Sequence, residues 1–106
     1  MTQIELYQAL QSTGYPVAYG SFSDSVTPPF IMYQFAYNSD LIADNVNYVP
    51  IENFQVELYT TKKDLAAEQK VQDKLKELGL PYRKFETYLD TEKMYQILYE
   101  VQLIGG

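Results

Sequence analysis

Residues 54–79, FQVELYTTKKDLAAEQKVQDKLKELG, predict a strand that is followed closely by a helix. From Phe54 to Tyr59, apolar and polar residues alternate, as expected for a strand with one buried face. From Asp64 the period becomes helical and continues to Gly79, a residue that commonly ends helices in the left-handed conformation. The apolar stripe of this helix consists of Leu65, Val71, Leu75 and Leu78. Thr61 and Asp64 are candidates for its N-terminal cap.

The chain on either side of this stretch predicts one more helix and four more strands. Thr2 and Glu5 have the spacing of a capping box, and Gly14 followed by Pro16 ends the helix that they begin. The additional strands are expected at residues 15–19, 30–37, 81–88 and 94–104, with a loop at residues 38–47. Connections between strands are too short for crossover helices, so the sheet should be mostly antiparallel.

These elements predict an α+β fold for residues 1–106 as one domain, in the order α-β-β-β-α-β-β, with both helices packed on one face of the sheet. Two segments resemble each other and suggest an internal αββ duplication over about residues 1–37 and 64–104. The matching residues are Leu10, Gly14, Tyr15 and Pro16 against Leu75, Gly79, Leu80 and Pro81, and Met32-Tyr33-Gln34-Phe35 against Met94-Tyr95-Gln96-Ile97. The alternative is that any helix leading into a strand tends to end in Gly and Pro.

Charge is distributed unevenly along the sequence. Residues 1–61 contain six acidic residues and no Lys or Arg, whereas residues 62–106 contain eight of each sign. A cation-free half in a chain of net charge −6 offers no surface for a phosphate backbone, so sequence-specific nucleic-acid binding is not expected. Acidity can also simply keep a protein soluble.

The amino-acid composition excludes most kinds of catalytic site. The chain has no His, Cys or Trp, which excludes imidazole or thiol nucleophiles and thiolate metal sites. Asp40 and Asp44 are oxygen ligands for a hard cation, but they lack the spacing of a calcium loop and are explained by turn chemistry. The sequence therefore predicts no enzyme, no metal and no cofactor, and without a run of 18 apolar residues it predicts no membrane association.

Two groups of residues are candidates for an interface. The segment around residues 41–49 is too apolar for a solvated connection and either contacts a partner or folds back onto the sheet. Its apolar residues are Leu41, Ile42, Val46, Tyr48 and Val49. Lys63, Lys70 and Lys74 share one side of the second helix, which is either a solvated face or a contact for the acidic half of a neighbouring subunit.

Several stretches of the sequence resemble the tail-terminator or tail-completion proteins, also called head–tail joining or minor capsid proteins, from the necks of long-tailed bacteriophages and prophages of Gram-positive bacteria. The stretches that carry this resemblance are Gly14 to Tyr19, Pro28 to Ile31, Asn53 to Thr60 with Lys62-Lys63-Asp64, and Glu92 to Glu100.

This resemblance implies a structural protein without catalysis, located in the virion neck and, before assembly, in the host cytoplasm. Such proteins assemble as a ring, usually hexameric, that terminates the tail tube and contacts the head-connector (stopper) protein. DNA passes through the ring, and an acidic lumen that includes Glu52 and Glu57 would repel it. The alternative function is a small ligand-binding or regulatory domain, a monomer or dimer in which the two halves frame a pocket.

Overall fold

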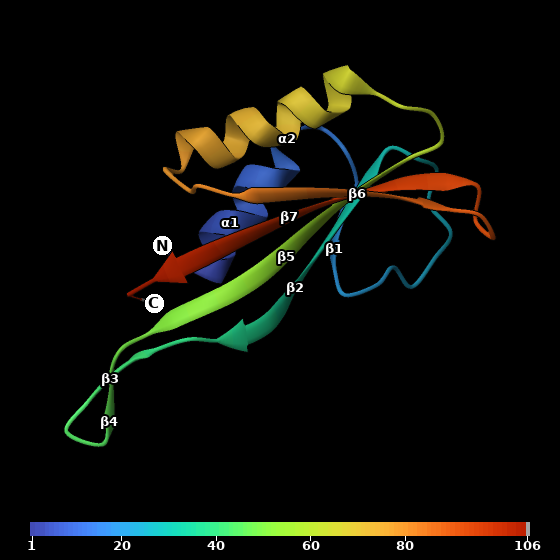
Figure 1. Cartoon of the computed structure of the whole chain (residues 1–106). Helices are drawn as coiled ribbons and strands as arrows, with labels where there is room; N and C mark the ends of the chain where they lie inside the picture. The colour runs from blue at the N-terminus through green and yellow to red at the C-terminus, as the bar shows by residue number, and fades with distance from the viewer. Residues whose placement is uncertain (106) are drawn as a thin grey trace.

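Two helices and seven strands make up the part of the chain that the computed structural model describes, residues 1–105 (Figure 1). They follow one another as α1 (Gln3–Gln11), β1 (Val17–Tyr19), β2 (Phe30–Asn38), β3 (Leu41–Ala43), β4 (Val46–Val49), β5 (Ile51–Thr60), α2 (Leu65–Glu77), β6 (Arg83–Leu89) and β7 (Met94–Ile104). The predicted α+β class is confirmed. The predicted order lacked β3 and β4, which occupy half of the segment expected to be a loop, residues 38–47, and extend beyond it to Val49.

Five strands form one sheet in the order β1-β2-β5-β7-β6. Every neighbouring pair in it is antiparallel except β1 and β2, so the sheet is mostly antiparallel, as predicted. The exception arises because residues 20–29 carry the chain back along the sheet before β2 begins. Strands β3 and β4 pair only with each other and form a separate hairpin.

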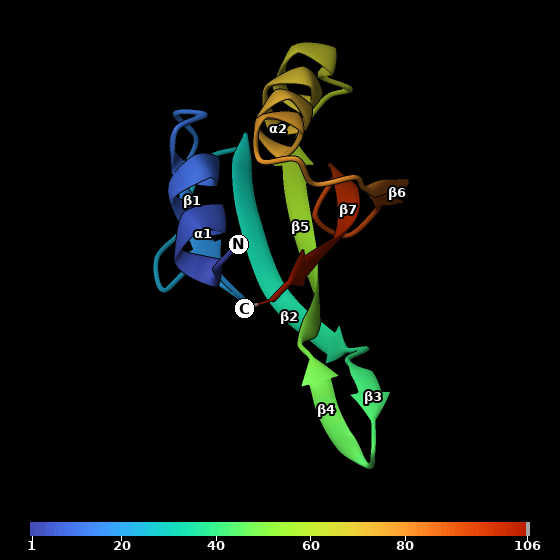
Figure 2. The ribbon, with the colours of Figure 1, turned by 90° about the vertical axis from the view of Figure 1, so that its left-hand side faces the viewer.

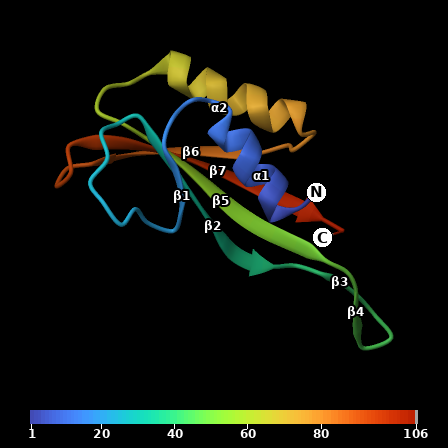
Figure 3. The same ribbon diagram turned by 180° about the vertical axis from the view of Figure 1, so that it is seen from behind.

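Both helices cover the same face of the five-stranded sheet, α1 in front of the strands and α2 along one side (Figure 3). Their buried side chains meet alternate residues of the strands, because successive residues of a strand point to opposite faces. The resulting core contains Leu6, Leu10, Ala67, Val71 and Leu75 from the helices and Ile31, Tyr33, Phe54, Val56, Leu58, Ile97, Tyr99, Val101 and Leu103 from the sheet. The opposite face of the sheet is covered by neither helix.

Both helices begin at N-terminal caps that the sequence predicts, Thr2 and Asp64. The Thr2 hydroxyl accepts a hydrogen bond from the Glu5 backbone N–H, and the Glu5 carboxylate accepts one from the Thr2 N–H. At α2 the cap is Asp64, whose carboxylate accepts from the Ala67 N–H at 3.0 Å.

Leu65 was wrongly assigned to the buried stripe of α2, since it is 69% exposed. At 100° per residue it lies roughly 100° around the helix from the direction midway between Val71 and Leu75, beyond the buried face. Ala67 and Glu68 are buried there instead.

The internal duplication predicted for residues 1–37 and 64–104 is not reproduced by the strand pairing. In the first half β1 runs parallel to β2, whereas in the second half β6 runs antiparallel to β7. The shared Gly-x-Pro pattern is also what two helices that each end before a strand would show, as in the alternative given above.

The molecule is longer than a compact domain of its size. Its radius of gyration is 14.7 Å and its extents are 49 × 28 × 25 Å, whereas a compact domain of 100 residues has a radius of gyration of about 13 Å. Figure 2 shows the reason: the β3–β4 hairpin projects from the end of the sheet, away from both helices.

Candidate functional site

The projecting hairpin, residues 39–50, is called the arm below. Its two strands are joined at Asp44 and Asn45, which both have positive φ, at 53° and 63°. Positive φ at both central residues defines the hairpin turn whose twist matches that of the strands, and Asp and Asn are among the residues that tolerate it. The polar residues of this segment thus form the turn, and the apolar residues form the strands.

The arm exposes the apolar residues that the sequence singled out. Ile42 and Tyr48 are 66% and 72% exposed, Leu41 and Val46 are also exposed, and Val49 is partly buried. The segment does not fold back onto the sheet, so that alternative is excluded. A two-stranded hairpin is barely stable alone in water, and exposed apolar clusters of this kind commonly mark surfaces that contact a partner, so the arm is the candidate interface.

Hydrogen bonds hold the root of the arm in place. The Asp40 carboxylate accepts from the Ile51 backbone N–H and from the Asn47 side chain, each at 2.9 Å, and these hydrogen bonds lower the pKa of Asp40. Asn53 donates to the Tyr37 carbonyl and to the Ser39 hydroxyl. The arm therefore leaves the sheet in a defined direction.

The three lysines predicted as an interface all have partners within the same subunit. Lys63 precedes the helix and forms ion pairs with Glu68 and Glu86. Lys70 lies 5.1 Å from the centre of the Tyr15 ring, and Lys74 lies 3.4 Å from Glu77. Helix α2 begins after Lys63, so the three lysines do not form one continuous stripe along it. The charges of Lys63 and Lys74 are partly neutralised by glutamates of the same subunit.

Glu68 is a buried carboxylate that the sequence analysis missed. It is 2% exposed and lies 2.7 Å from both Lys63 and Lys84, joining the start of α2 to β6. Burial raises the pKa of Glu68, but the hydrogen bonds and charges of the two lysines outweigh burial, so its pKa is lowered. A pKa below the unfolded value means that this carboxylate stabilises the fold above the unfolded pKa and less so as pH falls through the folded pKa.

Glu68→Gln should reduce the free energy of unfolding at pH 7 by about 2 kcal/mol, below the usual cost of breaking a buried ion pair because both lysines reach solvent. Urea unfolding at pH 7 and at pH 3 measures this. The difference from the wild type should be smaller at pH 3 than at pH 7, because lowering the pH moves Glu68 toward its protonated form and removes the charge that the two lysines stabilise. Glu77→Gln, which removes an exposed pair, is the control and should change stability by less than about 1 kcal/mol. An equal loss of unfolding free energy in Glu68→Gln and Glu77→Gln would contradict the assignment of Glu68 as a stabilising buried ion pair.

Glu52 and Glu57 do not form the single acidic surface that was expected. They are five residues apart on β5, so they point to opposite faces of the sheet. Glu57 is only 7% exposed, and its carboxylate accepts hydrogen bonds from the Tyr59 hydroxyl at 2.7 Å and the Gln34 side chain at 3.0 Å. The alternating pattern cannot distinguish a solvated glutamate from one that is buried by polar neighbours.

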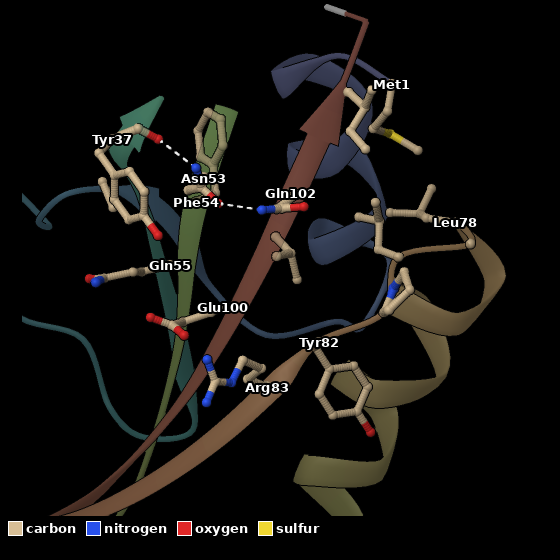
Figure 4. Close-up of a pocket in the computed structure, with 16 residues that line it drawn as sticks. Met1, Tyr37, Asn53, Phe54, Gln55, Leu78, Tyr82, Arg83, Glu100 and Gln102 are labelled. Atoms are coloured by element: carbon tan, nitrogen blue, oxygen red, sulfur yellow. Dashed lines mark hydrogen bonds between the residues drawn. The ribbon is translucent and has the colours of Figure 1, made fainter. Parts of the chain in front are cut away.

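A cavity of about 590 Å³, called the notch below, lies beside the root of the arm (Figure 4). One wall is the end of β7, including Glu100, Val101, Gln102 and Ile104, and the other is the linker from Leu78 to Arg83. Tyr37 and Asn53 complete the side nearest the arm. Nothing in the sequence pattern indicated this cavity, because it depends on where β6 stops pairing with β7.

Other kinds of site find no support in the described chain. Among residues 1–105 no three acidic residues lie together as ligands for a metal ion. Neither helix in that range has the length and apolar character needed to cross a membrane. No protein-family model and no curated protein sequence matches this chain.

Proposed function

We propose that this chain is a structural subunit of a bacteriophage or prophage neck, which terminates the tail tube and joins it to the head connector as part of a ring. The observation that carries the proposal is the arm, an exposed apolar hairpin held at a fixed angle to the sheet. A subunit with such an arm can contact a neighbour by a head-to-tail interface, which closes into a ring when the rotation fits. The sequence resemblance to tail-terminator proteins gives the biological setting.

Light scattering coupled to size exclusion tests the assembly. We expect a species of about 74 kDa, six copies of a 12.3 kDa chain, whose fraction rises with protein concentration. The mass should persist when salt is raised, because the arm is mainly apolar and the lysines are engaged within the subunit. Binding of the purified protein to isolated tails lacking their terminator then tests the neck function itself. A protein that forms no ring and does not bind tails would contradict the proposal.

The notch favours a second function, that of a small ligand-binding or regulatory domain. Its volume lies within the range of about 300–1,000 Å³ typical of small-molecule sites, and the polar residues Arg83, Glu100 and Gln102 line it together with apolar ones. This function predicts a monomer or a dimer of fixed mass, so the same scattering measurement distinguishes the two.

A further inference from the structure

The notch lies at the edge of the sheet, where β6 ends and no strand within residues 1–105 pairs with the outer side of the last residues of β7. Strand β6 pairs with β7 from Leu89 opposite Met94 to Arg83 opposite Glu100, and there its pairing ends. Strand β7 continues to Ile104 and is paired with β5 from Tyr95 to Ile104. The last four residues of β7 therefore have a partner strand on one side only, and the notch lies along the other side (Figure 4).

The backbone of β7 leaves hydrogen-bonding groups unpaired in this notch. The Gly105 N–H donates to the Pro50 carbonyl at 2.9 Å, so residues facing β5 alternate backward from Gly105 through Leu103 and Val101. Gln102 and Ile104 direct their backbone N–H and C=O groups to the opposite side, toward the notch. An edge with unpaired groups beside apolar side chains is a template for one more strand.

We propose that the notch binds strand β4 from the arm of a second copy of this chain, which extends the sheet beside the end of β7. This inference rests on the proposed ring, because it names the surface that receives the arm. The arm of the same subunit cannot reach the notch. Its root is held by the hydrogen bond that Asp40 accepts from Ile51 and the one that Asn53 donates to Ser39, and the arm projects outward (Figure 2). A second copy supplies the same arm without that constraint.

Length and side-chain chemistry match between the two surfaces. Strand β4 has four residues, and the unpaired edge of β7 also has four, Val101 to Ile104. Val46, Val49 and Leu41 share one face of the arm through their pairing register, and Leu78, Leu80 and Ile104 line the notch. Apolar side chains on this face of an added strand can thus enter the cavity while its backbone pairs with β7.

The charges of the two surfaces are also complementary. The arm, residues 39–50, contains Asp40 and Asp44 and no cation. The segment that contains the linker wall, residues 76–84, carries Lys76, Arg83 and Lys84 against the single acid Glu77. Of these, Arg83 lines the notch itself, as does Glu100 on the β7 wall, and Lys84 is paired with Glu68. In the described chain Lys76 and Arg83 form no ion pair, although Figure 4 shows the Arg83 side chain directed toward Glu100. Opposite charge favours this pairing over the contact of two arms, which would bring like charges together.

Cross-linking between introduced cysteines tests the contact directly, because the chain has no cysteine of its own. The variant Tyr48→Cys with Ile104→Cys carries one thiol on the arm and one beside the notch. With a short bismaleimide we expect a ladder of covalent species that ends at the size of the ring. Tyr48→Cys with Lys70→Cys, which places the second thiol on α2, is the matched control and should give at least tenfold less product.

A second test removes the unpaired N–H without altering the apolar cavity. Gln102→Pro lacks the N–H that faces the notch, and proline is tolerated at the outer edge of a sheet. Both Gln102→Pro and Gln102→Ala lose the hydrogen bond that the Gln102 side chain donates to Asn53. Gln102→Ala keeps the backbone N–H and is therefore the matched control. We expect Gln102→Pro to weaken association at least tenfold relative to Gln102→Ala, with both variants folded by circular dichroism.

The outcomes separate this inference from the proposed function. A ladder, together with weaker association of Gln102→Pro, supports both the arm–notch contact and the ring. A product that stops at the dimer supports the contact and contradicts the ring. Assembly to about 74 kDa with no cross-linking above the control overturns the arm–notch contact and leaves the ring intact. A wild type that stays monomeric at every concentration and yields no cross-linked product overturns the contact, as does equal association of the proline and alanine variants.

Discussion

Leu41→Asp combined with Ile42→Asp is expected to convert the assembled protein into a folded monomer of 12.3 kDa. Both side chains are more than half exposed in the single subunit, so the substitutions remove no core contact. In an assembled ring the same positions would be buried against a neighbour, and two carboxylates would lose their hydration there. Residues at the centre of an interface contribute about 2 kcal/mol or more each, so the dissociation constant should rise at least a hundredfold.

Light scattering and circular dichroism measure the two halves of this prediction. The mass should fall to that of one chain while the spectrum stays unchanged and the melting temperature shifts by only a few degrees. The matched control is Ile4→Asp with Leu65→Asp, which adds the same charge at apolar residues that are 68% and 69% exposed on the two helices. The control should assemble normally. Normal assembly of the arm variant, or equal loss in both, would show that the arm is not the interface.

The sequence predicts this fold well in the segments where apolar residues recur with a clear helical or strand period. Both helices, their N-terminal caps and the strand β7 are predicted, because each rests on a local pattern that tertiary contacts reinforce. The arm was predicted as an exposed apolar segment but not as a hairpin. Asp44 and Asn45 between two short apolar runs are a hairpin signal, and treating the apolar runs on either side of this turn as paired strands would have predicted β3 and β4.

The remaining features depend on contacts between distant residues. In the sequence, Glu68 looks like any polar residue of an amphipathic helix. Its side chain is buried beside β6, where Lys84 lies 2.7 Å from its carboxylate, and this contact is visible only in the folded structure. The notch arises from the different lengths of β6 and β7, which no local pattern encodes. Contacts between elements, and where the pairing of β6 with β7 stops, therefore decide the buried ion pair and the notch.

Glu57→Lys is expected to destabilise the fold strongly, in contrast to Glu52→Lys. The Glu57 carboxylate is an acceptor for two donors, Tyr59 and Gln34, whereas an ammonium group has no acceptor to offer them. Burial, together with the hydrogen bond to Glu57, raises the pKa of Tyr59 to about 12, so its hydroxyl stays a protonated donor at neutral pH. Loss of two charge-assisted hydrogen bonds and burial of an unpaired cation should cost about 3 kcal/mol or more.

Thermal unfolding at pH 7 distinguishes the two variants. For a domain of this size a loss of about 3 kcal/mol lowers the melting temperature by about 12–24 °C. Glu52 makes no hydrogen bond or ion pair through its side chain within residues 1–105 and is partly exposed, so Glu52→Lys should change stability by less than about 1 kcal/mol. Glu57→Gln keeps an acceptor for Tyr59 and should fall between them. If Glu57→Lys melts at the wild-type temperature, the side chain is solvated, and the hypothesis of an acidic surface facing DNA becomes tenable for this face of the sheet.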